Sequence, residues 1–72
     1  MREKIIALIE QQLELPEGSV KPENRIEDID GWDSLDHVLI IGELESQLGI
    51  SIPLDEAIDI ITVEDLLKKA GA

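Results

Sequence analysis

The sequence predicts an all-α fold: a small four-helix bundle, with three main helices, one short helix and a long first loop. Apolar residues recur at helical spacing in three segments, near residues 2–15, 34–48 and 62–70. Helix-capping residues precede the last two of these segments, and Gly or Pro follows the first two. The chain has 72 residues, about half of a typical domain, so we expect one domain spanning residues 1–72.

The first predicted helix covers Arg2 to Leu15. One arc of its helical wheel is apolar, formed by Ile5, Ile6, Ile9 and Leu13. The opposite face is polar and carries Glu3, Lys4, Glu10, Gln11 and Glu14. Pro16 and Gly18 end this helix, and no periodicity follows until Trp32. We therefore expect a long loop, held to the core by its apolar residues Val20, Ile26 and Ile29.

The second predicted helix follows Asp33, an expected N-cap residue, and runs to about Leu48 before Gly49. Asp36 occupies the capping-box position three residues after the cap. The helix has two apolar arcs. We expect the first to face the core, with Ile40, Ile41, Leu44 and Leu48. The second has no evident use in a four-helix domain except as a partner surface, with Leu35, Val38, Leu39 and Gly42.

Two further elements complete the predicted bundle. An extended stretch ending at Pro53 leads into a helix of at most two turns, from Leu54 to Ile60, with Ala57 and either Ile60 or Ile61 facing inward. Thr62 and Asp65 form a capping box that opens the last helix, whose buried positions are Val63, Leu66, Leu67 and Ala70. Two ion pairs at helical spacing are expected there, Glu64 with Lys68 and Asp65 with Lys69.

Charge and composition exclude several classes of function. Seventeen acids and six bases give a net charge of −11, and the 42 residues from Ile26 to Leu67 contain 12 acids but no Lys or Arg. Such a field repels nucleic acids and anionic membranes and attracts basic protein surfaces. A core this small cannot spare a large enclosed cavity, so we do not expect an enzyme. The longest apolar run, Val38–Ile41, cannot span a bilayer, and neither Cys nor a signal-peptide pattern is present. We expect a cytoplasmic monomer.

A motif at the start of the second helix indicates function. Asp33-Ser34-Leu35, preceded by Gly31-Trp32, resembles the phosphopantetheine attachment motif of acyl and peptidyl carrier proteins. The register of later residues makes the resemblance specific: Ile-x-Ile-Pro at residues 50–53, then Ala57, then Thr62-Val63. The similarity extends from about Glu3 to Ala70. It implies a four-helix bundle, with phosphopantetheine transferred from coenzyme A to Ser34 by a phosphopantetheinyl transferase.

The resemblance also implies what such a protein does. Carriers of this family hold acyl or aminoacyl groups as thioesters on the arm and present them to partner enzymes. Ser34 would carry the arm, with Asp33 and Leu35 beside it. We expect partners with basic docking surfaces, including a loading ligase and downstream biosynthetic enzymes. The expected partner face comprises Leu35, Asp36, Val38, Leu39, Gly42, Glu43, Glu45, Asp55 and Glu56.

Residues around the motif allow other interpretations. We interpret His37, the only His, as a hydrogen-bonding residue between loop and helix rather than a general base. A hydrolase triad is excluded, because Ser34, His37 and the nearby Asp share one helical turn and no second element supplies an oxyanion hole. Trp32 fits equally a core plug for the loop or a partner-facing aromatic. The acidic run from Asp28 fails the EF-hand pattern, which requires Gly at its sixth position and Glu at its twelfth. We expect no tight metal site.

Departures from the family pattern suggest a pathway. Leu39 stands where carriers of fatty-acid synthesis usually have Glu, and Gly42 stands where they often have Met. The Gly-Trp approach is more usual in carriers of polyketide, nonribosomal-peptide or other specialised pathways. We therefore expect a carrier of a specialised pathway. We also expect it to be free-standing, because the chain begins with Met and ends soon after the last predicted helix. The alternative is an unmodified acidic interaction module that docks a basic partner through the second apolar arc. A third interpretation is a calcium buffer.

Overall fold

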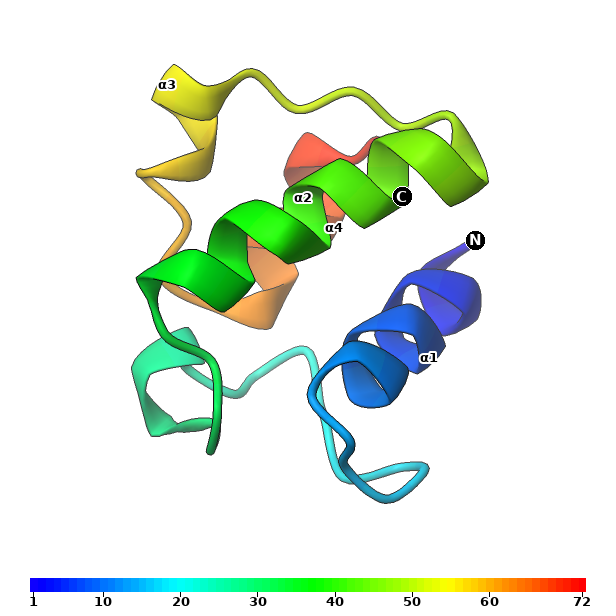
Figure 1. Cartoon of the computed structure of the whole chain (residues 1–72), viewed down its shortest axis with the longest axis vertical. Coiled ribbons are helices and arrows are strands. Elements are labelled where there is room, and N and C mark those ends of the chain that lie inside the picture. Colours follow the sequence, from blue (N-terminus) through cyan, green and yellow to red (C-terminus); the bar gives the residue numbers. More distant parts are fainter.

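In the computed structural model, which describes all 72 residues, α1 (Arg2–Gln12) and α2 (Ser34–Leu48) run side by side in roughly opposite directions. A long loop with one 3-10 turn, η1 (Ile26–Asp28), connects them, and the short helices α3 (Leu54–Ala57) and α4 (Val63–Lys69) complete the bundle (Figure 1). The predicted small all-α fold is thus confirmed. No helix combines the length and hydropathy that a membrane crossing requires.

The first helix differs from its prediction at two points. It ends at Gln12 rather than Leu15, because Glu14 adopts a left-handed conformation (φ 57°) that breaks the helical path. The assignment of Glu10 to the solvent face was wrong. Its side chain is buried, and its carboxylate accepts a hydrogen bond from the backbone N–H of Val20 at 3.0 Å. A residue of α1 thereby ties down the loop that follows it.

Backbone hydrogen bonds join the long loop to the beginning of α4. The N–H of Ile26 donates to the carbonyl of Ile61 at 2.9 Å, and the N–H of Val63 donates to that of Asn24 at 3.0 Å. Val20 is buried, while Ile26 and Ile29 pack half-buried against the core. The three apolar residues expected to hold the loop therefore do so.

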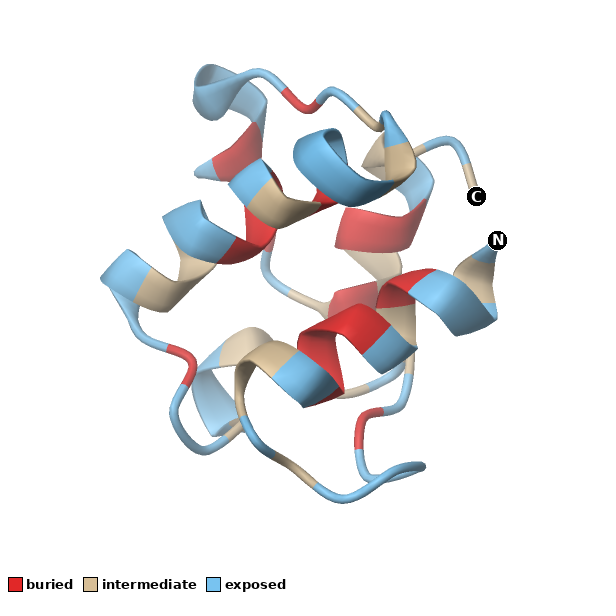
Figure 2. Cartoon of the chain, turned by 45° about the vertical axis from the view of Figure 1, so that its right-hand side comes forward, coloured by how far each residue is buried: buried red, intermediate tan, exposed pale blue.

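The ends of α2 form as predicted. The Asp33 carboxylate accepts the N–H of Asp36 at 2.9 Å, and Gly49 ends the helix in a left-handed conformation (φ 67°) that glycine adopts without strain. The reciprocal half of a capping box, from the Asp33 N–H to the Asp36 carboxylate, is not formed. Ile40, Ile41 and Leu44 of the first arc are buried, as expected. Figure 2 shows that the buried segments of the helices face the interior of the bundle.

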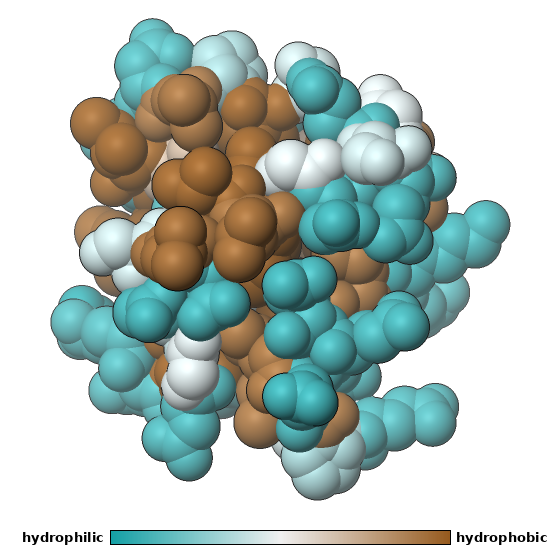
Figure 3. Space-filling model, in the orientation of Figure 1, coloured by the Kyte–Doolittle hydropathy of each residue, from teal (hydrophilic) through white to brown (hydrophobic).

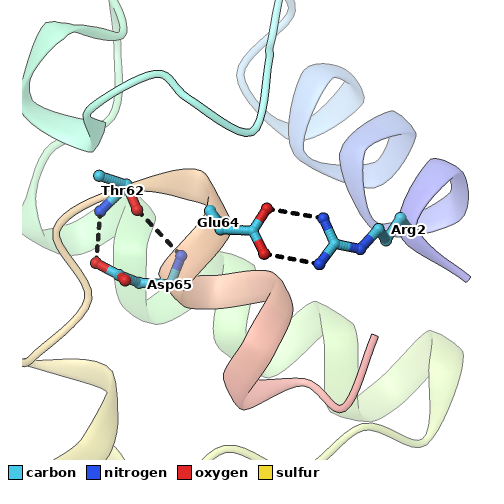
Figure 4. Close-up of polar contacts among 4 residues, drawn as sticks. All are labelled: Arg2, Thr62, Glu64 and Asp65. Carbon is cyan, nitrogen blue, oxygen red and sulfur yellow. Dashed lines mark hydrogen bonds and ion pairs between the residues drawn. The ribbon is translucent and has the colours of Figure 1, made fainter.

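α3 is shorter than predicted, whereas α4 begins as predicted. α3 is a single turn, after which Ile60 is buried and Ile61 is exposed. The predicted capping box of α4 is present. The Asp65 N–H donates to the Thr62 hydroxyl oxygen at 3.1 Å, and the Asp65 carboxylate accepts the Thr62 N–H at 3.0 Å (Figure 4).

The two ion pairs expected within α4 are not formed. Glu64 instead accepts two hydrogen bonds from the Arg2 guanidinium, at 2.7 and 2.8 Å, and so links α4 to the start of α1 (Figure 4). Asp65 is engaged in the capping box, and the ammonium of Lys69 lies 3.9 Å from the Glu56 carboxylate. A bidentate pair with the planar guanidinium is more favourable than a flexible lysine contact on the same helix.

Candidate functional site

Ser34 is the first residue of α2, and its side chain is exposed. The chain reaches it through a turn in which Gly31 has a left-handed conformation (φ 82°) and the N–H of Trp32 donates to the carbonyl of Ile29 at 3.2 Å. Trp32 is buried, whereas Asp33 and Ser34 after it are exposed. The buried ring anchors the approach, so the hydroxyl is held at a fixed point on the surface.

A chain of two hydrogen bonds connects this approach with α3. The indole Nε1–H of Trp32 donates to Nδ1 of His37 at 3.0 Å, and Nε2 of His37 lies 2.8 Å from the carbonyl oxygen of Ala57. The indole can only donate and the carbonyl can only accept, so in this bridge Nδ1 of His37 is the acceptor and Nε2 is the donor. The predicted role of His37 as a hydrogen-bonding residue is confirmed, and Trp32 is a core plug.

Asp33 and Asp36 flank Ser34, and each shifts the pKa of the other. The hydrogen bond from the Asp36 N–H is the main cause that lowers the pKa of Asp33. Partial desolvation raises the pKa of Asp36, and its interaction with Asp33 adds to the rise. This negative setting opposes tight binding of a free phosphate, so a phosphate group held here would need a covalent bond.

An open groove of about 760 Å³ lies beside Ser34. It extends from the first loop over the start of α2 to the segment between α3 and α4. Its apolar walls and floor are formed by Ile26, Trp32, Val38, Ala57, Ile58, Ile60 and Ile61. Its polar members are Arg25, Glu27, Asp33, Ser34 and His37. An exposed hydroxyl at the mouth of a largely apolar groove suits a long substituent that lies along the surface.

The predicted partner residues occupy two neighbouring elements. On α2, Leu35, Val38 and Leu39 are 68%, 52% and 45% exposed, and only Val38 also lines the groove. Of the remaining predicted residues of α2, Asp36 and Glu43 are half-buried, while Gly42 and Glu45 are exposed. Asp55 and Glu56 are exposed on α3. The second arc of α2 is therefore open to solvent, as predicted.

Three exposed apolar residues were missed by the sequence analysis. Leu54, Ile58 and Ile61 are 63%, 79% and 55% exposed and extend the apolar surface of α2 onto α3 and the segment after it. Figure 3 shows this continuous apolar patch, bordered by hydrophilic residues. Ile58 and Ile61 also line the groove beside Ser34. The signal in the sequence was the surplus of apolar residues after Pro53, which a single buried helix face cannot accommodate.

Comparison with known proteins gives consistent results. A family model described as a phosphopantetheine attachment site matches residues 3–69. An acyl carrier protein of Helicobacter hepaticus is 42% identical over 66 residues, which cover 90% of this chain and 86% of that protein. An acyl carrier protein of Chlorobium phaeobacteroides is 34% identical over 67 residues, which cover 93% of this chain and 86% of that protein. A solved structure of a candidate acyl carrier protein from Mycobacterium tuberculosis is similar at TM-score 0.86 and 30% identity, covering 97% of this chain and 93% of that one.

Fold and comparisons together define the class of protein: a carrier, not an enzyme. The chain belongs to the acyl carrier protein family and contains its phosphopantetheine attachment domain. Members of this family bind phosphopantetheine covalently, receive it from a phosphopantetheinyl transferase and interact with biosynthetic enzymes.

The surface around Ser34 fits a phosphopantetheine arm. The hydroxyl is exposed, the first turn of α2 presents backbone N–H groups near it, and the groove offers apolar contact to a flexible chain. When bound, the arm supplies the thiol on which carriers of this family hold their cargo. The protein would supply the attachment point and a surface along which the arm could lie.

Proposed function

We propose that this protein is an acyl or aminoacyl carrier in which Ser34 bears the phosphopantetheine arm. The observation that carries the proposal is the placement of Ser34, which is exposed on the first turn of α2 beside a groove of about 760 Å³. Intermediates would be held on the arm as thioesters and presented to successive partner enzymes, and the protein itself would perform no catalysis.

Attachment requires one group-transfer step at the Ser34 hydroxyl. Its Oγ forms a bond to the phosphorus that carries the pantetheine chain of coenzyme A. The bond from that phosphorus to the nucleotide phosphate breaks, so the adenosine bisphosphate leaves with the electron pair. The hydroxyl proton passes to a base of the transferase. Asp33 orients the helix start through its hydrogen bond to the Asp36 N–H rather than acting as that base.

The test is an intact mass spectrum after incubation with coenzyme A, magnesium and a permissive phosphopantetheinyl transferase. We expect the wild-type protein and Ser46→Ala to gain one phosphopantetheinyl group, and Ser34→Ala to gain none. Ser46 is an exposed serine of the same helix, so it controls for a general effect of removing a hydroxyl. Modification of Ser34→Ala, or none of the folded wild type with several transferases, would refute the proposal.

The alternative is an unmodified interaction module. It is favoured by the exposed apolar patch of Leu35, Val38, Leu39, Leu54, Ile58 and Ile61. Under this alternative, Ser34→Ala would keep full partner function while the fold is unchanged. Under the carrier proposal, the same substitution abolishes function in any assay that requires loaded cargo.

Partners and pathway follow from the surface composition. We propose that the transferase, a loading ligase and downstream enzymes dock with basic surfaces on the acids Asp36, Glu43, Glu45, Asp55 and Glu56, around the apolar residues of α2. Leu39 and Gly42 make this face less acidic and flatter than is usual in carriers of fatty-acid synthesis. This supports a role in a polyketide, nonribosomal-peptide or related specialised pathway, carried out by a cytoplasmic monomer.

A further inference from the structure

We infer that His37 is a positioning residue that sets how deeply cargo can lie in the groove beside Ser34. The inference rests on the proposed attachment at Ser34. Its structural basis is the bridge in which His37 accepts the indole N–H of Trp32 at 3.0 Å and donates to the carbonyl of Ala57 at 2.8 Å. All three residues line the groove, and each comes from a different part of the chain.

The bridge is the only side-chain hydrogen bonding between α2 and α3. Few other contacts hold α3 in place. It is a single turn, Leu54 at its start and Ile58 just after it are exposed, and its one ion pair is the 3.9 Å contact of Glu56 with Lys69 of α4. Its inward contacts are the small side chain of Ala57 and the following Ile60. The bond from His37 to the Ala57 carbonyl therefore determines how closely α3 approaches α2.

Behind the bridge lies the hydrophobic core. His37 precedes Ile40, Ile41 and Leu44 by three, four and seven residues, so it continues the buried arc of α2 toward the groove. Those three residues are buried, whereas His37 is half-buried. The hydrogen-bonded bridge of Trp32, His37 and Ala57 therefore forms the floor of the groove and separates it from the buried face of α2. A smaller side chain at position 37 would leave space that extends the groove toward this arc.

This arrangement selects the kind of cargo that the protein shelters. The walls above the bridge are apolar, with Ile26, Val38, Ile58 and Ile61, so a short apolar acyl group gains contact there. A longer chain meets the bridge of Trp32, His37 and Ala57 and must extend into solvent. His37 thus sets an upper length for the part of an acyl cargo that is removed from water.

The test measures melting temperature as a function of cargo length. The protein is loaded with saturated acyl groups of increasing length from the corresponding acyl-coenzyme A by a permissive transferase, and each loaded form is compared with the unacylated one. Because each sheltered methylene stabilises the folded state, the rise in Tm should increase with length and then level off. We expect the wild type to level off at short chains and His37→Ala to level off at longer chains.

Further variants distinguish a positioning role of His37 from a general effect on stability. The side-chain amide of Gln has an acceptor oxygen and a donor NH2 group, so it can form both bonds of the bridge. In His37→Gln the rise in Tm should therefore level off at short acyl chains, as in the wild type. Val38→Ala removes part of the apolar wall of the groove. It should reduce the rise in Tm for each added carbon but leave unchanged the acyl length at which Tm levels off. If His37→Ala does not fold, Trp32→Phe breaks one bond of the bridge while it keeps an aromatic ring, and it should move the levelling-off in the same direction.

A second readout needs no cargo. Trp32 is the only Trp, so its indole N–H gives one NMR signal. Its hydrogen exchange should be slow in the wild type and His37→Gln and faster in His37→Ala. Equal exchange in all three, or one levelling-off length in every loaded variant, would overturn the inference. A wild type that accepts no group at Ser34, as judged by mass, would instead refute the proposed function.

Discussion

Glu64 and Asp65 are adjacent carboxylates of α4, and each has a lowered pKa for its own reason. The hydrogen bonds from the Arg2 guanidinium are the main cause for Glu64, whereas backbone N–H groups of Thr62 and Ile61 are the main causes for Asp65. Each is more acidic in the folded state than in the unfolded chain. Each therefore stabilises the fold above its unfolded pKa, which is about 4, and this contribution is lost as pH falls through the folded pKa.

Replacing Glu64 with Gln should expose this dependence. At neutral pH the variant should melt several degrees below the wild type, because the charged partner of Arg2 is gone. The difference should begin to shrink below about pH 4 and close as pH falls through the lowered folded pKa of Glu64, where the wild-type carboxylate is protonated as well. The measurement is a series of thermal unfolding curves from about pH 7 to about pH 2.5.

Glu45→Gln is the matched control for that series. Glu45 is an exposed carboxylate of α2 without an ion pair, so its loss should leave Tm nearly unchanged or slightly raised at neutral pH. A Tm difference between Glu64→Gln and the wild type that persists undiminished in acid would show that the Arg2 pair is not its origin.

Local residue roles could be predicted from the sequence, whereas distant ones could not. Asp33, Gly49 and Thr62 act on backbone groups within five residues, so their types and spacing predicted their roles. Glu10 accepts from a residue ten positions away, and Glu64 pairs with a residue 62 positions away. Such pairs depend on how whole elements pack, which a local pattern does not determine.

At the scale of elements, α2 has a core face and an exposed face, and both were predicted. Leu44 is fully buried, while Leu39 is 45% exposed. Leu44→Ala should reduce the free energy of unfolding by about 2–5 kcal/mol through lost burial and an unfilled cavity. Leu39→Glu should leave Tm nearly unchanged, since the new carboxylate remains in water.

The same pair of variants tests the partner face. Leu39→Glu should lower kcat/KM for modification by the transferase, because it places a charge within the apolar surface that we propose for docking. Leu44→Ala, assayed well below its Tm, should be modified at a rate near that of the wild type. A large loss of stability in Leu39→Glu would place Leu39 in the core and contradict this assignment.

Element lengths and the site itself were predicted only in part. The sequence pattern placed all four α-helices, but it extended α1 and α3 too far, because a turn that ends a helix depends on backbone conformations such as that of Glu14. The motif predicted the position of Ser34 at the helix start. The groove could not be predicted, since it is assembled from the first loop, α2 and the segment around Ile58. Those parts meet only in three dimensions.

At the scale of the whole molecule, the net charge of −11 dominates the electrostatics. Three ion pairs are formed, and none involves a residue of α2. The protein measures 26 × 21 × 20 Å, whereas the Debye length is about 30 Å at 0.01 M ionic strength and about 3 Å at 1 M. In dilute buffer every acid therefore interacts with the others across the whole molecule, and in concentrated salt it interacts only with its neighbours.

Raising ionic strength should therefore raise Tm. The loss of repulsion among the 17 acids should stabilise the fold by more than weakening the ion pairs of Arg2, Arg25 and Lys69 destabilises it. Magnesium should act at lower concentration than sodium, because a divalent cation concentrates more strongly around an acidic surface. Thermal unfolding across a sodium chloride series and a magnesium chloride series measures both effects.

A variant that combines Asp30→Asn with Asp59→Asn loses two exposed charges. It should melt at a higher temperature than the wild type in dilute buffer, and its Tm should change less with added salt. A Tm that stays constant or falls with added salt would show that attraction between specific pairs, rather than overall repulsion, governs stability.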